Sequence, residues 1–266
     1  MRMKKTLLTV AGFDPTSGAG VSLDLRIFQS AGFQGMAVLT SLTEQNTEEV
    51  KNIYCLTPEF VKAQYETLRK DIPFSGIKVG MLGSGKNIPV IKQILADNPK
   101  IPRVVDPVFK SSSGTWLLEP ESIPGYILEI RGKASLLTPN LEEASLISGK
   151  KIATEEDMRT AAREIYSLGR IPCLIKGGHF PNQNLNLLYD GKGFHLFKKE
   201  KLKKRVHGTG CFLSSSLLAY MARGASLEKA CRLALELVHK AIEDAEAYGR
   251  GQLLITWGQG STLDIK

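Results

Sequence analysis

The sequence predicts an α/β protein whose central sheet is mainly parallel, and three observations support this prediction. Short apolar runs alternate with helical patterns almost from one end of the chain to the other. Most of these runs end in Gly, Pro, Asp or Asn, as buried parallel strands do where they open into loops. One segment, "LNLLYDGKGFHLF", places the turn sequence "YDGKG" between two alternating runs and predicts an antiparallel hairpin at an edge of the sheet.

Six apolar runs are the expected parallel strands. Each is short and is followed by a loop or a helical pattern, so the order of elements is that of a doubly wound sheet. In such sheets, ligands bind at the carboxyl ends of the strands. The six runs span residues 6–12, 36–42, 76–81, 103–107, 134–140 and 172–178.

Three segments carry clear helix signals. Residues 57–70 begin with "TP", a threonine cap followed by proline at the first helical position. Residues 154–168 open with "TEED", which places acidic side chains in the first turn. Residues 226–242 repeat apolar side chains at helical spacing on one face, and Cys231 lies on that face, so we expect this cysteine in the core.

Length and charge narrow the class of protein. The chain has 266 residues without an internal repeat or long linker, so we expect a single domain over residues 1–266. A formal charge of +8 favours an anionic partner such as a phosphate ester or a nucleotide. The basic run at residues 198–205 is typical of a solvated strand end or loop, with a functional patch as the alternative. Because no aromatic residues interleave that run, we expect no nucleic-acid partner.

The cysteines and the N-terminus indicate a reduced, cytoplasmic protein. Cys55, Cys173, Cys211 and Cys231 show neither paired nor zinc-binding spacing. The apolar stretch near the N-terminus is short and lacks the cleavage region of a signal peptide. No other segment is long enough to span a bilayer, so we expect no membrane association.

Two early loops are candidates for binding a small molecule. Residues 11–25 contain several glycines, with Asp24 following on the early helix. This loop matches neither the GxGxxG fingerprint nor the GxxxxGK[ST] motif, so a functional loop and a mere tight turn are equally consistent with it. Gln45 and Asn46, after the second strand, offer paired donors and acceptors that suit a planar heterocycle.

Carboxylates at the ends of two later strands are candidate magnesium ligands. Asp106 follows one strand, and Asn140 to Glu143 follow the next. Carboxylates in this position can hold Mg²⁺, directly or through water, beside phosphates. Asn140 is equally well placed to cap a helix.

The segment "VHGTGCFLSS" predicts an anion site at the start of a helix. Gly208 and Gly210 let backbone N–H groups turn toward one point, where they could bind phosphate oxygens. Lys176 would add a positive point charge near the same phosphate oxygens. Cys211 lies at this helix N-terminus, where the helix dipole lowers a thiol pKa, so it could act as a base or hydrogen-bond acceptor for a substrate hydroxyl. The alternative for Cys211 is a small core residue.

Taken together, these motifs resemble the hydroxymethylpyrimidine/phosphomethylpyrimidine kinases of thiamine biosynthesis, within the ribokinase-like superfamily. The resemblance covers nearly the whole chain, and its motifs occur in family order. They are "AGFDPTSGAG", Asp24, "LTEQNT", "KVGMLGS", "VVDPV", "LTPNLEEA", "KGGH" and "HGTGCFLSS".

The resemblance implies a fold and an activity. The fold would be a three-layer αβα sandwich. Because family members are commonly dimers, we expect a homodimer. The enzyme would use ATP and Mg²⁺ to phosphorylate the hydroxymethyl group of 4-amino-5-hydroxymethyl-2-methylpyrimidine, and then the monophosphate to the diphosphate. Such catalysis depends mainly on positioning and charge stabilisation.

The resemblance also implies roles for individual residues. The pyrimidine pocket would contain Gln45, Met81, Gly12 and Asp24. ATP phosphates would be served by Lys176, Asn140 and Glu143, and Mg²⁺ by Glu143 and Asp106. The anion hole and the group that orients or deprotonates the hydroxyl would be Gly208, Thr209, Gly210 and Cys211.

Several positions near the expected phosphate site depart from the family pattern. Ser112 stands where the family usually has Lys, and we expect Lys110 or Arg205 to compensate. Arg205 and Val206 replace the usual Asn-Thr, and Phe212 replaces Thr. The usual Gly-His-Gly-Pro C-terminal motif is missing. These departures leave open the substrate range and the second phosphorylation, and they motivate one alternative, a non-catalytic pyrimidine-binding protein. The other alternative is a pyridoxal kinase of the same fold, because some members of this branch of the family accept pyridoxine-type substrates.

Overall fold

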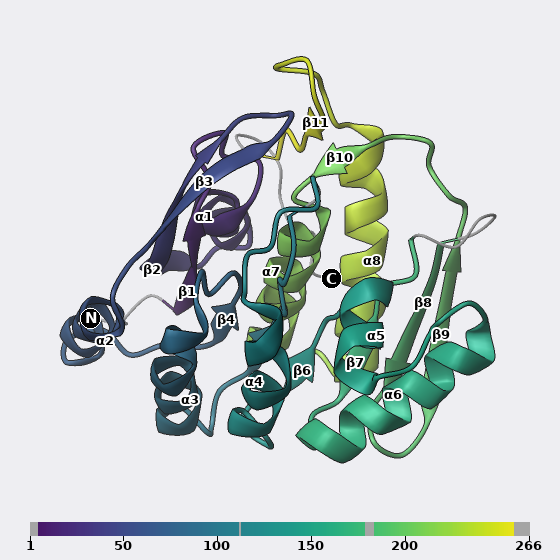
Figure 1. Cartoon of the computed structure of the whole chain (residues 1–266), viewed down its shortest axis with the longest axis horizontal. Coiled ribbons are helices and arrows are strands. Elements are labelled where there is room, and N and C mark those ends of the chain that lie inside the picture. Colours follow the sequence, from purple (N-terminus) through teal and green to yellow (C-terminus); the bar gives the residue numbers. More distant parts are fainter. Residues whose placement is uncertain (1–4, 112, 179–183, 258–266) are drawn as a thin grey trace.

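The computed structural model describes residues 5–111, 113–178 and 184–257, and within them the main feature is a nine-stranded sheet. Its strand order is β3-β2-β1-β4-β5-β6-β7-β8-β9 (Figure 1). The strands span β1 Thr6–Phe13, β2 Gln34–Gln45, β3 Val50–Cys55, β4 Ile77–Val79, β5 Arg103–Val105, β6 Leu136–Leu137, β7 Cys173–Ile175, β8 Asn184–Tyr189 and β9 Phe194–Lys199.

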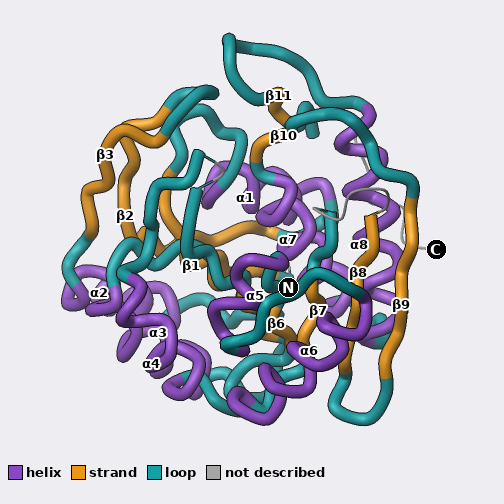
Figure 2. Tube along the Cα trace, turned by 45° about the vertical axis from the view of Figure 1, so that its right-hand side comes forward, coloured by secondary structure: helices purple, strands orange, loops and turns teal. Residues whose placement is uncertain are grey.

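The centre of the sheet is parallel and both of its edges are antiparallel. The strands from β2 to β7 in spatial order pair in parallel, which confirms the six expected strands. The hairpin β8–β9 joins β7 in antiparallel fashion, as predicted. At the opposite edge, β3 pairs antiparallel with β2 and was not predicted, because its sequence VKNIYC contains no apolar run. Figure 2 shows the two edges, β3 and β9, on opposite sides of the molecule.

Helices cover both faces of the sheet. The first face carries α1 Gly20–Ser30, α7 Thr209–Ala222 and α8 Leu227–Glu243. The second face carries α2 Pro58–Arg69, α3 Ile88–Asp97, α4 Ile123–Glu129, α5 Leu141–Ser148 and α6 Glu155–Gly169. Successive strand residues alternate between the two cores: Leu7 and Val104 pack with the first set of helices, and Leu8 and Val105 with the second. This confirms a three-layer αβα sandwich.

Local capping explains where several helices begin. Thr57 accepts a hydrogen bond from the backbone of Phe60, as expected of the cap of α2. Thr154 and Asp157 form a reciprocal capping box at α6. Cys231 of α8 is fully buried, as predicted, and all four cysteines are free thiols. In the part of the chain that the structure describes, no helix combines the length and apolar composition needed to cross a membrane.

A second, two-stranded sheet leads the chain into α7. Its strands, β10 Val206–His207 and β11 Leu253–Leu254, pair in parallel and lie at the top of Figure 1. The basic run before β10 consists of the end of β9 and a loop, as predicted for a solvated segment. The pairing of β10 with β11 fixes the position of the residues that open α7.

Candidate active site

A cavity of about 790 Å³ lies at the carboxyl ends of the parallel strands. It is lined by the loop after β1, the end of β2, the loops after β4 and β5, the start of α5, the end of β7 and the start of α7. Eleven of the twelve residues predicted for the site line it: Gly12, Gln45, Met81, Asp106, Asn140, Glu143, Lys176, Gly208, Thr209, Gly210 and Cys211.

Asp24 is the exception, and the prediction that it faces the substrate pocket is wrong. Its side chain on α1 is fully buried beneath the cavity. The carboxylate accepts hydrogen bonds from Thr9 Oγ1 at 2.6 Å, Lys78 Nζ at 2.8 Å and Ser215 Oγ at 2.7 Å. The position of Asp24 on the face of α1 that packs on the sheet turns the carboxylate toward β1 and β4, where Lys78 neutralises it.

Lys176 and Asp106 form an ion pair that borders the cavity. Lys176 Nζ lies 2.7 Å from Asp106 Oδ1, and Thr138 Oγ1 donates to the same oxygen at 3.0 Å. A Cβ added at Gly210 would lie 3.3 Å from both the Lys176 ammonium and an Asp106 oxygen. The first turn of α7 therefore lies directly against this pair, and a side chain at position 210 would crowd it.

Asn140 and Glu143 cap α5, which confirms the capping interpretation of Asn140, and both residues also line the cavity. Asn140 Oδ1 accepts from the Glu143 backbone at 2.9 Å, and the Asn140 backbone donates to Glu143 Oε2 at 2.6 Å. Burial raises the pKa of the Glu143 carboxyl to about 7; Lys176 opposes this rise, and Asp106 adds to it. Glu143 therefore changes protonation near neutral pH.

The carboxylates of Asp106 and Glu143 fit a magnesium site. Burial disfavours the charged form of Lys176, but the neighbouring Asp106 and Glu143 carboxylates raise the pKa of this lysine above its ordinary value. Two carboxylates thus share one ammonium group, which leaves negative charge for a cation to balance. The described residues contain no cluster of three or more His, Cys, Asp or Glu side chains able to hold a metal alone. Mg²⁺ typically binds through one or two carboxylates together with substrate phosphates, and this donor set matches that pattern.

The start of α7 presents backbone donors to the cavity. Gly208 is the N-cap residue, with φ of 80°, and a Cβ there would lie 1.8 Å from the Gly18 carbonyl oxygen. Glycine is therefore required at position 208. Among the described residues, no side chain caps α7, so the amides of Thr209, Gly210 and Cys211 remain available to an anion.

Cys211 lies in the first turn of α7, but the expected effect of the helix on its pKa is outweighed. Burial raises the pKa of the Cys211 thiol to about 11, although Lys78 acts in the opposite direction. Asp24 and Asp106 raise it further. This direction is opposite to the lowered pKa that the helix dipole led us to expect, because burial and the neighbouring carboxylates favour the neutral thiol. The thiol is protonated at neutral pH.

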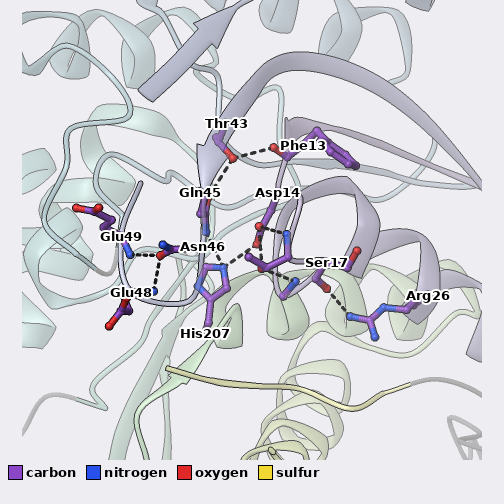
Figure 3. A network of polar contacts seen from close by, with 12 residues as sticks. Phe13, Asp14, Ser17, Arg26, Thr43, Gln45, Asn46, Glu48, Glu49 and His207 are labelled. Carbon is purple, nitrogen blue, oxygen red and sulfur yellow. Dashed lines mark hydrogen bonds and ion pairs between the residues drawn. The ribbon is translucent and has the colours of Figure 1, made fainter. Parts of the chain in front are cut away.

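Gln45 lines the cavity from the end of β2. Its side-chain amide lies against Thr43 and His207 (Figure 3). Asn46, which was expected to act beside it, instead accepts hydrogen bonds from the Glu48 and Glu49 backbones and holds the turn before β3. Gln45 is therefore the member of this pair that lines the cavity.

Gly12 and Met81 form the wall beside Gln45. A Cβ at Gly12 would lie 2.8 Å from Ser41 Oγ and 3.0 Å from Met81 Sδ. The missing side chain lets Met81 lie across the end of β1. Both residues line the cavity, where the pyrimidine pocket was expected.

Sequence reasoning missed Asp14 and His207, although both stand inside motifs that it selected. His207 Nε2 lies 2.8 Å from Asp14 Oδ2, and the two residues are 193 positions apart (Figure 3). The signal that could have found them is a titratable residue in each of two glycine-rich loops expected at the same edge of the sheet.

The structure places several of the departing residues. Lys110 and Arg205 line the cavity, as their expected compensating role requires, and Lys110 forms an ion pair with Glu142. Phe212 is fully buried and packs edge-on against Trp257, with ring centroids 5.2 Å apart. Position 112 and residues 258–266 lie outside the described residues.

Comparisons with known proteins agree with this geometry. The hydroxymethylpyrimidine/phosphomethylpyrimidine kinase of Aquifex aeolicus is 39% identical over 92% of this chain and 96% of its own. The solved phosphomethylpyrimidine kinase from Clostridium difficile has a TM-score of 0.79 and 36% identity, over 90% of this chain and all of its own. The pyridoxal kinase of Staphylococcus aureus in complex with pyridoxal has a TM-score of 0.88 and 30% identity, over 97% and 94%.

The family is set by a match over most of the chain. Residues 14–256 match the phosphomethylpyrimidine kinase family, a span that includes ten of the eleven predicted residues lining the cavity. The ribokinase-like architecture and the kinase identity that the motifs suggested are confirmed. This chain belongs to the phosphomethylpyrimidine kinase family.

Proposed function

We propose that this protein transfers the γ-phosphoryl group of ATP to the hydroxymethyl group of 4-amino-5-hydroxymethyl-2-methylpyrimidine, and then phosphorylates the monophosphate. The observation that carries this proposal is the arrangement within one cavity. Gln45, an amide suited to a heterocycle, lines the same cavity as the uncapped start of α7 and Lys176. The family membership supports the same reaction.

The phosphate end of the cavity supplies positive charge and fixed donors. Lys176 would contact the phosphoryl group in transfer, and the amides of Thr209 and Gly210 would receive the charge that develops on its oxygens. Mg²⁺, held by Asp106 and Glu143 with the phosphates, would neutralise charge on the ATP oxygens. Because these groups are held in place before the reaction, little reorganisation accompanies transfer.

Cys211 would position the substrate hydroxyl rather than remove its proton as a thiolate. The thiol is protonated at neutral pH, so it can exchange a hydrogen bond with the hydroxyl without carrying a charge. In this role it would hold the oxygen in line with the γ-phosphorus. The hydroxyl proton would pass to an oxygen of the transferred phosphoryl group, and the Lys176 ammonium near Cys211 would balance the negative charge that develops on the attacking oxygen.

The second phosphorylation would place another phosphate in the same cavity. Lys110, Lys204 and Arg205 also line it and give the added negative charge favourable partners. In this proposal, Lys110 and Arg205 would compensate for the missing lysine at position 112 when the monophosphate is the substrate.

The first experiment is to incubate the purified protein with Mg-ATP and the pyrimidine and to follow the products by mass spectrometry. We expect the monophosphate first and the diphosphate later. Monophosphate alone would limit the protein to the first step. Pyrimidine binding without any ADP formation would instead support the non-catalytic alternative.

A pyridoxal kinase is the second candidate, favoured by one observation. The pyridoxal kinase of Staphylococcus aureus, solved with pyridoxal, matches the fold over nearly the whole chain. Pyridoxal also carries a hydroxymethyl group on a planar ring, but it lacks the exocyclic amine. Comparison of kcat/KM on the two substrates separates the candidates, since faster turnover of pyridoxal would overturn our first choice.

We also propose that the protein is a homodimer, as the family resemblance implies. We propose that it has no nucleic-acid partner, because no aromatic residues interleave its basic run, and that it works in the cytoplasm, because its cysteines lack paired or zinc-binding spacing. Sedimentation velocity of the purified protein tests the dimer directly. A single species at 29.2 kDa, the mass of one chain, would contradict it.

A further inference from the structure

We propose that Asp14 and His207 set the orientation of the Gln45 side-chain amide, and thereby decide which hydrogen-bonding edge of a heterocycle the cavity accepts. The inference concerns two residues with no direct part in phosphoryl transfer. It rests on the proposed function, because it assigns the recognition of the ring to Gln45.

One nitrogen of His207 faces two partners. Nε2 lies 2.8 Å from Asp14 Oδ2 and 3.0 Å from the terminal amide of Gln45 (Figure 3). A neutral ring nitrogen either donates one hydrogen or accepts one, so it cannot accept from an amide N–H while it donates to a carboxylate. The stronger partner therefore decides which of the two it does.

Asp14 is the stronger partner because it is an ionised, fixed carboxylate. Although burial opposes ionisation, hydrogen bonds from His207 and Thr16 hold the pKa of Asp14 below its ordinary value. Oδ1 is occupied by the backbone N–H and the hydroxyl of Thr16, both at 2.8 Å, which leaves Oδ2 for His207. An unprotonated Nε2 would place two acceptors 2.8 Å apart. Nε2 of His207 therefore carries the hydrogen.

The orientation of Gln45 follows from that hydrogen. As placed, Gln45 Nε2 lies toward His207 and Oε1 toward Thr43, but the oxygen and nitrogen of a side-chain amide are assigned from their hydrogen bonds. With Nε2–H of His207 as a donor, the amide turns its carbonyl oxygen toward His207 and its NH₂ group toward Thr43. Thr43 Oγ1 lies 3.0 Å from the Phe13 carbonyl oxygen and 3.2 Å from Gln45 Oε1, and its single hydrogen cannot serve both acceptors. With the Gln45 amide turned, Thr43 donates to Phe13 and accepts from the Gln45 NH₂ group. In this arrangement every hydrogen in the chain from Gln45 to Phe13 meets an acceptor.

The histidine ring has little freedom to change this arrangement. A Cβ added at Gly18 would lie 2.6 Å from His207 Cδ2, so the ring packs closely on the loop after β1. The side chains of His207 and Asp14 are 14% and 5% exposed. His207 also directly precedes Gly208, the N-cap of α7, so one backbone segment carries both the ring-recognition end and the phosphate end of the cavity.

The fixed amide selects one pattern of donors on the ligand. Gln45 offers its carbonyl oxygen on the His207 side and its remaining N–H on the Thr43 side. A 4-aminopyrimidine presents an amino donor beside a ring-nitrogen acceptor and matches this pattern. The 4-oxo analogue reverses both groups and leaves two unpaired polar contacts, which is a strong basis for rejection.

The protonation of His207 can be measured in the free protein. Long-range ¹H–¹⁵N spectra, assigned with a His207→Asn variant, should show Nε2 protonated in the wild type. In Asp14→Asn, the introduced side-chain amide would keep the Thr16 contacts but donate to Nε2, so we expect the hydrogen to move to Nδ1. An unprotonated Nε2 in the wild type, or no change in Asp14→Asn, would overturn the proposal.

Substrate discrimination gives the second readout. The ratio of kcat/KM for the 4-amino substrate to that for its 4-oxo analogue should fall at least tenfold in Asp14→Asn, because Gln45 can then turn. Asp190→Asn is the matched control: this aspartate lies 3.6 Å from His195 in the β8–β9 hairpin and should leave the ratio unchanged. An unchanged ratio in Asp14→Asn contradicts the proposal. Failure of the wild type to phosphorylate any pyrimidine contradicts the proposed function, whereas the spectra still decide the amide orientation.

Discussion

Two lysine–aspartate pairs lie close together in this molecule, and their surroundings differ. Lys78 Nζ is 2.8 Å from Asp24 Oδ2, and Lys176 Nζ is 2.7 Å from Asp106 Oδ1. Both side chains of the first pair are 0% exposed, whereas the Lys176 side chain is 16% exposed and lines the cavity. The distances alone do not distinguish the pairs.

The partners around each pair show what it does. In the Lys78–Asp24 pair, called the sealed pair below, Thr9 and Ser215 also donate hydrogen bonds to the Asp24 carboxylate, so both of its oxygens have partners. In the Lys176–Asp106 pair, called the open pair below, Glu143 adds a second carboxylate beside the single ammonium group, so negative charge is in excess. The first pair therefore holds α1 and α7 on the sheet beneath Cys211, and the second is free to exchange partners with phosphates and a cation. Exposure to the cavity therefore distinguishes the pair proposed for catalysis, Lys176–Asp106, from the structural pair, Lys78–Asp24.

The largest expected effect comes from breaking the sealed pair. Lys78→Met leaves the Asp24 carboxylate buried without a counter-charge, and we expect the free energy of unfolding to fall by about 3–5 kcal/mol. Urea denaturation measures the change. The double variant Lys78→Met/Asp24→Leu, which removes both charges, should recover most of the loss, and a single variant as stable as the wild type would contradict a structural role.

The open pair should show the opposite balance between activity and stability. Lys176→Met is expected to lower kcat by about 10²–10³-fold, because it removes a donor aimed at the transferred phosphoryl group. The loss in stability should be smaller than for Lys78→Met, since Glu143 can take up a proton. An ADP-coupled assay and a melting curve on the same sample measure both. Near-normal kcat would remove Lys176 from the chemistry.

Glu143 gives this comparison a pH dependence. Its pKa rises from the ordinary value of 4.5 to about 7 in the folded protein, so its contribution to stability is fully present below about pH 4.5 and is lost as the pH rises through about 7. Without Mg²⁺, we expect the stability of the wild type relative to Glu143→Gln to fall by about 3 kcal/mol between about pH 4 and about pH 8. Denaturant titrations across this range test the sign. Parallel curves for the two proteins would show that Glu143 has an ordinary pKa.

The smallest effect is expected at Cys211, which lies between the two pairs. If the protonated thiol only positions the hydroxyl, Cys211→Ser should keep kcat within about tenfold of the wild type, and Cys211→Ala should lose more. Steady-state kinetics with intact far-UV spectra tests this order. A serine variant as inactive as the alanine variant would point to a thiolate base.

The sequence predicted the parts of the fold that depend on local signals. The six parallel strands, the β8–β9 hairpin and the caps at Thr57 and Thr154 all follow from short patterns of apolar, turn and capping residues. The edge strand β3 was missed because its sequence contains no apolar run. Strand register and the pairing of β10 with β11 depend on distant segments, which local patterns do not encode.

The candidate site shows the same limit. Motif spacing brought most of the lining residues together, because parallel strands end at one edge of the sheet. The burial of Asp24 and the raised pKa of Cys211 were missed, since both depend on what packs above the residue. His207 and Asp14 are 193 positions apart in the sequence, and local sequence patterns do not predict a contact over such a separation.

The contact between Phe212 and Trp257 has a consequence for how this chain can change. Trp257 donates to Ser30 of α1, and Arg26 donates to its backbone carbonyl, so the ring that meets Phe212 is itself anchored to a second helix. A smaller side chain at position 212 would leave a gap next to the phosphate end of the site, and a smaller one at 257 would expose Phe212. The two positions are therefore epistatic: the threonine usual in the family is expected to be tolerated at position 212 only after position 257 has also changed.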